Sequence, residues 1–169
     1  MRTSPTDTHR TDPGASCRML QTLLDGYRGT ALIYIAAKLG LPDLLADRPQ
    51  SSDTLARALG AHTPSLHRIM RGLVALGVFA EGDDGRFGLT ALGACLQRET
   101  PGSLHIAAIV WGEQFVGAWG GLLHSALTGE TAFNHVFGRS IWEIWPQHPE
   151  FNQEILLSLL RGYRIKGRA

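Results

Sequence analysis

Apolar residues recur at helical spacing along most of the chain, beginning at Cys17. From Cys17 to Leu39 the pattern predicts a long helix, which Gly26 and Gly29 would weaken enough to kink or break. Within it, residues 30–39 are apolar on nearly every side. A helix of that kind is expected to be buried all round, often against a second chain.

Short helices with clear start and stop signals follow the first run. Gly40 is expected to stop the long helix, and Pro42 opens a short one where its missing N–H costs nothing. Either Ser51 or Ser52 can cap the segment DTLARAL, which Gly60 ends.

The next segment predicts an amphipathic helix followed by a hairpin. Thr63 is expected to cap the helix and Gly77 to end it. Its apolar stripe comprises Leu66, Ile69, Met70, Leu73 and Leu76. The segments VFAE and RFGL, joined by the turn GDDG, predict a β-hairpin. Helix, turn, helix and two-stranded hairpin is the order of a winged helix.

The remaining sequence predicts helices and no further strand. Thr90 caps the segment ALGACLQ, and residues 103–127 predict a helix that several glycines interrupt. Residues 128–139 mix polar and aromatic side chains and predict a loop. Ser140 then caps IWEIW, and a last helix is expected over about 150–163.

Composition indicates a folded protein without a strongly charged partner. The 169 residues are 44% hydrophobic and 18% charged, which supports a sizeable core. A formal net charge of +1 argues against a broad footprint for nucleic acid or anionic lipid. We find neither a signal peptide nor an apolar run of about 18 residues, so we expect a cytoplasmic protein with no membrane span. Cys17 and Cys95 show no C-x-x-C spacing and are expected to be free thiols.

Motifs for nucleotide chemistry are missing from the sequence. A dinucleotide or S-adenosylmethionine site on an α/β sheet needs a strand, a glycine-rich turn and a helix. No G-x-G follows an apolar strand, and the P-loop and G-x-S-x-G signatures do not occur. No two of the seven histidines stand at i, i+4 on one helix, so we expect neither a metal site nor a catalytic residue. His124 and His135 bracket a polar turn, where a structural role is favoured over ligand binding.

Aromatic side chains concentrate in the second half of the chain. They are Trp111, Phe115, Trp119, Phe133, Phe137, Trp142 and Trp145. Pockets for small molecules are lined by such rings, so the segment could form one wall of a site for a flat substrate. Aromatic residues at helical spacing more often fill the core between helices, and both interpretations stay open here.

Arginines on the predicted winged helix raise a second hypothesis, a DNA-binding or regulatory protein. They are Arg57, Arg68, Arg71 and Arg86. Such side chains could meet phosphates. However, Asp83 and Asp84 at the tip of the hairpin would repel the DNA backbone, so a solvated face is favoured.

Several stretches occur in a specific order and spacing. They are ALIYIAAKLGLPDLLAD, SSDTLARALGAHTPSLHRIMRGLVALGVFAE, DGRFGLTALGACLQ and PGSLHIAAIVWGEQFVGAWGGLLHSALTGETAFNHVFG. Together they resemble the N-terminal region of bacterial small-molecule O-methyltransferases, which methylate natural-product hydroxyls and have plant caffeate-type enzymes as distant relatives. The resemblance covers about residues 17–155 and includes the run AW-x-x-LLHS-x-x-TGE-x-AF.

The resemblance implies a homodimer formed by intertwined N-terminal helices, with the winged helix serving packing rather than DNA. It also implies substrate contacts from Trp111, Phe115, Phe133 and Phe137. In such enzymes the S-adenosylmethionine site and the catalytic histidine belong to a C-terminal Rossmann-like domain. After FNQEILLSL this chain continues as LRGYRIKGRA, where a family member would lead towards a glycine-rich strand.

We therefore expect a mainly α fold: a winged-helix-like helical domain with a small β-hairpin and no Rossmann domain. Residues 1–14 would form a disordered tail and 15–100 the dimerisation helices and winged helix. Residues 101–163 would form a helical extension, and 164–169 a second tail. The expected role is a dimerisation and substrate-wall module truncated before the S-adenosylmethionine domain. No cofactor is expected on this chain, and a separate catalytic domain is a candidate partner.

Overall fold

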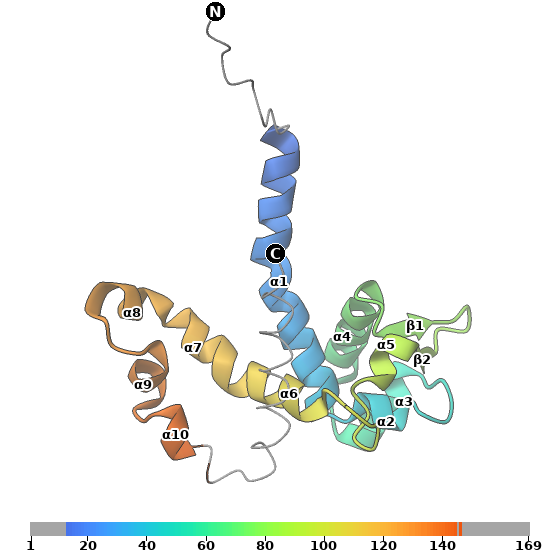
Figure 1. The fold of residues 1–169 in the computed structure, drawn as a ribbon. Helices are drawn as coiled ribbons and strands as arrows, with labels where there is room; N and C mark the ends of the chain where they lie inside the picture. The colour runs from blue at the N-terminus through green and yellow to red at the C-terminus, as the bar shows by residue number, and fades with distance from the viewer. Residues whose placement is uncertain (1–12, 145, 147–169) are drawn as a thin grey trace, which may run out of the picture.

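The computed structural model describes residues 13–144 and residue 146, and it is mostly helical. One two-stranded antiparallel sheet completes the described part, so the expected mainly α fold with a small hairpin is confirmed. Figure 1 shows a long first helix from whose base two groups of elements extend to opposite sides. One group holds the short helices and the hairpin, and the other holds the later helices.

The first helix, α1 (Pro13–Lys38), is uninterrupted. It begins earlier than Cys17 because proline is tolerated in the first helical turn. Gly26 and Gly29 lie inside it without a break, so the expected kink is not observed. The disordered tail was predicted for residues 1–14, but Pro13 and Gly14 already belong to α1, and residues 1–12 lie outside the described residues.

Glycine and serine signals set the next boundaries as predicted. Gly40 adopts a left-handed φ of +64° between α1 and α2 (Leu41–Leu44), and Gly60 ends α3 (Ser52–Leu59) with a φ of +62°. Ser51, rather than Ser52, caps α3, because its hydroxyl oxygen accepts a hydrogen bond from the Thr54 N–H at 3.2 Å.

The predicted cap of α4 (Thr63–Ala75) is wrong by one residue. Thr63 is already helical, and His62 is the N-cap. The reason lies in the backbone: the His62 carbonyl accepts hydrogen bonds from the N–H groups of Ser65 and Leu66, at 3.1 and 3.0 Å. His62 therefore provides the first helical acceptor.

The hairpin pairs β1 (Phe79–Glu81) with β2 (Phe87–Leu89) in antiparallel register, with Phe79 opposite Leu89. Gln50 adds an isolated bridge, since it exchanges both backbone hydrogen bonds with Phe87 at 2.9 and 2.8 Å. The observed order of α3, α4 and hairpin is the predicted winged-helix order.

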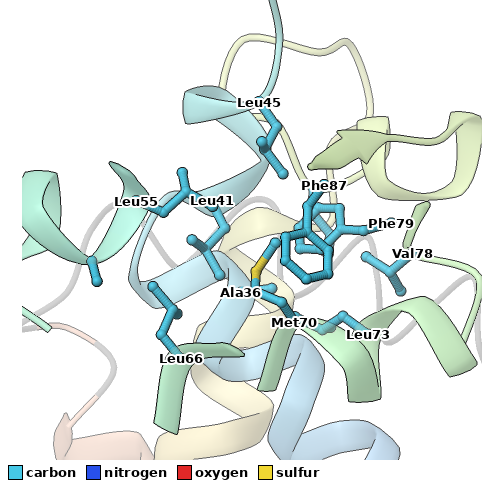
Figure 2. Packing of buried hydrophobic residues seen from close by; sticks show 12 residues of the cluster. Ala36, Leu41, Leu45, Leu55, Leu66, Met70, Leu73, Val78, Phe79 and Phe87 are labelled. Carbon is cyan, nitrogen blue, oxygen red and sulfur yellow. The ribbon is translucent and has the colours of Figure 1, made fainter. Parts of the chain in front are cut away.

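The core lies where α1 to α4 meet the hairpin, as Figure 2 shows. Its labelled side chains are Ala36, Leu41, Leu45, Leu55, Leu66, Met70, Leu73, Val78, Phe79 and Phe87. Of the stripe predicted on α4, Ile69 is half-buried and Leu76 is exposed. Ala36 and Ala37 of α1 are fully buried within their own chain, and most of the other residues in 30–39 are half-buried there without a second copy.

The later helices follow one another with short turns. They are α5 (Ala91–Ala94), α6 (His105–Val110), the π-helical segment η1 (Trp111–Phe115), α7 (Val116–Gly120), α8 (Leu122–Thr128), α9 (Ala132–Phe137) and α10 (Ile141–Ile144). Thr90 caps α5 as predicted, accepting from the Gly93 N–H at 3.1 Å. The helix predicted over 150–163 and the ring of Trp145 lie outside the described residues.

The loop predicted over residues 128–139 is wrong, because α9 occupies its centre. Gly129 and Gly138 have φ values of +78° and +71°, and these left-handed turns close α8 and α9. Among the described helices, none alone is long and apolar enough to cross a membrane. The pair His105–Gly120 and Leu122–Thr128 meets those criteria together, with a 44° bend between its members.

Candidate functional site

An apolar cavity of about 390 Å³ lies between α1, α5 and α6. Ile33 of α1, Leu92 of α5 and Ala108 of α6 contribute to its walls. Trp111 lines the same cavity, and Cys95, an exposed free thiol as expected, lies at its side. Such a lining suits an apolar group rather than a charged ligand.

The four aromatic residues predicted to contact a substrate form two separate ring pairs. Trp111 and Phe115 have centroids 5.0 Å apart, while Phe133 and Phe137 on α9 are 4.7 Å apart. All four are half-buried. Both pairs are tilted, an arrangement that stabilises aromatic contacts. Of the four, only Trp111 lines the apolar cavity.

Helix α9 packs against α7, which brings the second pair close to the helix that follows the first. A Cβ placed on Gly117 would lie 3.3 Å from Cζ of Phe137, so this glycine permits the close approach. The ring pair on η1 and the ring pair on α9 are therefore linked through α7, which follows η1 directly and packs against α9. Contact with a substrate stays a prediction for all four.

A cluster of three polar side chains, which the sequence did not indicate, joins α1 to η1. The Lys38 ammonium lies 2.6 Å from Oε1 of Glu113, and the Tyr34 hydroxyl donates to the same oxygen at 3.2 Å. Burial raises the pKa of Tyr34, and the charge and hydrogen bond of Glu113 raise it further. The hydrogen bond to Glu113 also raises the pKa of Lys38.

This group lies at the π-helical segment, where one turn holds an extra residue. Such segments occur often at functional sites, and here the segment carries Trp111 and Phe115. No local pattern in the sequence indicates this contact, because Tyr34 and Glu113 are 79 positions apart.

Large apolar side chains are exposed along the N-terminal half of α1. They are Met19, Leu20, Leu23, Leu24 and Tyr27. Each is between 59% and 69% exposed, and Figure 1 shows this half of α1 standing clear of the other described elements. We call these five residues the α1 apolar face. Contiguous exposed apolar surface of this kind marks an interaction site.

The arginines of the DNA hypothesis are already engaged with neighbours in their own module. Arg71 pairs with Glu81 at 3.8 Å, and Arg86 pairs with Asp84 at 3.3 Å. Arg57 donates to the Asp53 carbonyl at 3.3 Å. Exposed pairs of this kind are weak, yet they place acids beside the proposed phosphate contacts and disfavour DNA binding.

Comparison with known proteins gives a consistent set of matches. The model of the O-methyltransferase dimerisation domain matches residues 21–99. Phenazine O-methyltransferase PhzM of Lysobacter antibioticus is 43% identical over 132 residues, which are 78% of this chain and 39% of that protein. O-demethylpuromycin-O-methyltransferase of Streptomyces alboniger is 33% identical over 161 residues, or 95% of this chain and 43% of that protein.

The fold agrees with the sequence matches. The crystal structure of LaPhzM superposes with a TM-score of 0.76 at 41% identity, covering 82% of this chain and 42% of that one. The chain therefore spans well under half the length of the relatives it matches.

Proposed function

Because residues 21–99 belong to the O-methyltransferase dimerisation-domain family, we propose that this chain forms a homodimer and supplies one wall of a methyl-acceptor pocket. The observation that carries the dimer is the α1 apolar face, part of which lies inside the matched residues. A second copy of the same helix is the occupant that the family assignment favours.

Magnitudes support pairing through this face. Full burial of a large apolar side chain contributes about 1.5–3 kcal/mol, and each member of the face is still more than half exposed. Five such side chains from each copy offer a gain on the order of 10 kcal/mol, comparable to the roughly 4–15 kcal/mol cost of association. The dimer thus depends on burying the whole face at once.

A substitution meant to break the dimer should be made in the α1 apolar face. The sequence pattern indicated residues 30–39 as the surface that a second chain would cover. Ile33 packs against the core of its own subunit, so a carboxylate there would damage the subunit itself. Leu23 is 69% exposed, so a charge at that position leaves the subunit intact and tests association alone.

The wall of the acceptor pocket would come from the two ring pairs. Half-buried, tilted rings on η1 and α9 offer apolar faces to a planar substrate while remaining supported by their own helices. The names of the relatives agree with this chemistry, since one acts on a phenazine. We propose a planar hydroxylated aromatic as the substrate class.

To test the wall, 1-naphthol is added as a probe to the full 169-residue chain. Binding is followed by the NMR signals of the phenylalanine rings. We expect weak, saturable shifts centred on Phe133 and Phe137, reduced several-fold in Phe137→Ala. Trp119→Ala is the matched control, because its ring is 66% exposed and lies outside both pairs. The absence of shifts at Phe133 and Phe137, or shifts of unchanged size at Phe133 in Phe137→Ala, would contradict the proposed wall. The dimer is tested separately: light scattering should give a particle mass twice the chain mass of 18.4 kDa.

A further inference from the structure

Two histidines and a glutamate converge where α8 turns into α9. His124 lies on α8, Glu130 in the turn and His135 on α9. Nε2 of His124 is 2.7 Å from Oε2 of Glu130. The rings of His124 and His135 stack with centroids 3.7 Å apart and an interplanar angle of 10°. One possible ligand atom from each of the three side chains falls within 4.8 Å of the others.

The backbone of the turn fixes this arrangement. Gly129, with its φ of +78°, reverses the chain so that α9 packs back on α8. The Thr128 hydroxyl donates to the His124 carbonyl at 2.8 Å and accepts from the Glu130 N–H at 3.2 Å. The elements that carry the three side chains are therefore held together before any ligand arrives.

We propose that His124, Glu130 and His135 bind a divalent transition-metal ion such as Zn²⁺, with water in the remaining position. Imidazole nitrogen and carboxylate oxygen are ligands that zinc accepts, and two histidines with one carboxylate is a common ligand set. The sequence predicted no metal because it offered no i, i+4 pair of histidines on one helix. Here the two rings come from different helices.

The geometry requires a small adjustment for binding. Zinc bonds to nitrogen at about 2.0–2.1 Å, so its ligand atoms stand roughly 3.4 Å apart in a tetrahedral site. The 2.7 Å contact between His124 and Glu130 must therefore lengthen, and the other separations, which are within 4.8 Å, must shorten by up to about 1.4 Å. The stacked rings must also open so that both nitrogens aim at one point. His135 is exposed and Glu130 is 54% exposed, so both can turn.

A hydrogen bond between His124 and Glu130 alone could also account for their contact. That contact does not need His135, whose ring nevertheless lies against His124. Ion binding would use all three side chains and would join α8 to α9. Because Phe133 and Phe137 lie on α9, the ion would also restrict the helix that carries one ring pair.

Calorimetric titration of ZnCl₂ into the untagged full chain tests the site. We expect one equivalent per chain, with affinity at least tenfold lower in His124→Ala and in His135→Ala. His62→Ala is the matched control, since His62 is an exposed histidine on the winged-helix module, and its affinity should equal that of the wild type. Circular dichroism checks that each variant keeps its helical content.

Histidine ring signals in NMR give a second readout that does not depend on the variants. Zn²⁺ should move the signals of His124 and His135 and leave that of His62 in place. The proposal is overturned if no binding occurs at 100 µM Zn²⁺. It is equally overturned if binding persists unchanged in both His124→Ala and His135→Ala, because the ion would then be held by other residues.

Discussion

The ring of Tyr34 on α1 occupies the space in which a side chain on Gly112 would begin. A Cβ at Gly112 would overlap the Cβ, Cγ and Cδ2 atoms of Tyr34, so only glycine lets η1 approach α1 this closely. The same approach places Glu113 within reach of Tyr34 and Lys38. One glycine therefore permits the packing of the long first helix on the π-helical segment.

Gly112→Ala should lower the free energy of unfolding by about 1–3 kcal/mol, the usual cost of forcing an extra carbon into packed space. Gly120→Ala is the matched control, because nothing lies within 4 Å of a Cβ there. That variant should be neutral or more stable by about 0.5–1 kcal/mol, since alanine favours a helix over glycine. Urea denaturation of both variants measures the difference, and equal stabilities would contradict the close approach.

Tyr34 should lose its proton above its ordinary pKa of 10.0, because burial and Glu113 both raise the pKa of its phenol. The folded chain holds this proton more tightly than the unfolded chain does. The resulting stability is complete below pH 10.0 and is lost as the pH rises through the raised pKa.

The absorbance of phenolate, taken as wild type minus Tyr34→Phe, isolates this titration. Glu113→Gln should shift its midpoint down towards the ordinary value, because the negative charge is removed. A wild-type midpoint at or below 10.0 would contradict the raised pKa, and a midpoint that Glu113→Gln leaves unchanged would show that Glu113 does not act on Tyr34.

S-adenosylmethionine should not bind to this 169-residue chain alone. The sequence offers no glycine-rich turn after an apolar strand, so we expect no set of backbone N–H groups arranged to hold the donor. Calorimetry at millimolar donor should give no saturable heat. Micromolar binding would reveal a site that neither the sequence nor the described residues indicate.

Local signals in the sequence predicted much of the fold. Caps at Ser51 and Thr90 depend on a side chain and an N–H three residues away, and the hairpin depends on one turn between two short apolar strands. The left-handed glycines Gly40 and Gly60 end helices for reasons of backbone geometry alone. Predictions of this kind need no knowledge of what packs nearby.

Features that depend on distant contacts could not be predicted this way. Tyr34 meets Glu113 only because α1 packs on η1, and no local pattern marks an extra residue in a helical turn. Helix α9 lies between Gly129 and Gly138 and has only six residues, which is too short for apolar periodicity to stand out. Apolar character alone also could not separate residues 30–39, packed in their own chain, from the exposed face that precedes them.

The α1 apolar face leads to a matched pair of substitutions for the dimer. At 100° per residue, the five members occupy one side of α1, and Leu23 lies within it, midway between Met19 and Tyr27 along the helix. Gln21 lies on the other, polar side with Asp25. Leu23→Glu and Gln21→Glu add the same charge through the same good helix former, on different sides of the helix. Gln21→Glu also replaces the exposed hydrogen bond to Asp25 with a like-charge pair, which costs only roughly 0.2–0.5 kcal/mol.

Sedimentation velocity of the wild type and both variants at tens of micromolar tests the homodimer most directly. We predict a wild-type species of twice the 18.4 kDa chain mass, a monomer for Leu23→Glu and an unchanged dimer for Gln21→Glu. The reason is that an unpaired carboxylate buried in an apolar interface costs several kcal/mol, which weakens association by about 100-fold or more. A wild-type monomer at this concentration, or a Leu23→Glu variant that still sediments as the dimer, would contradict the account.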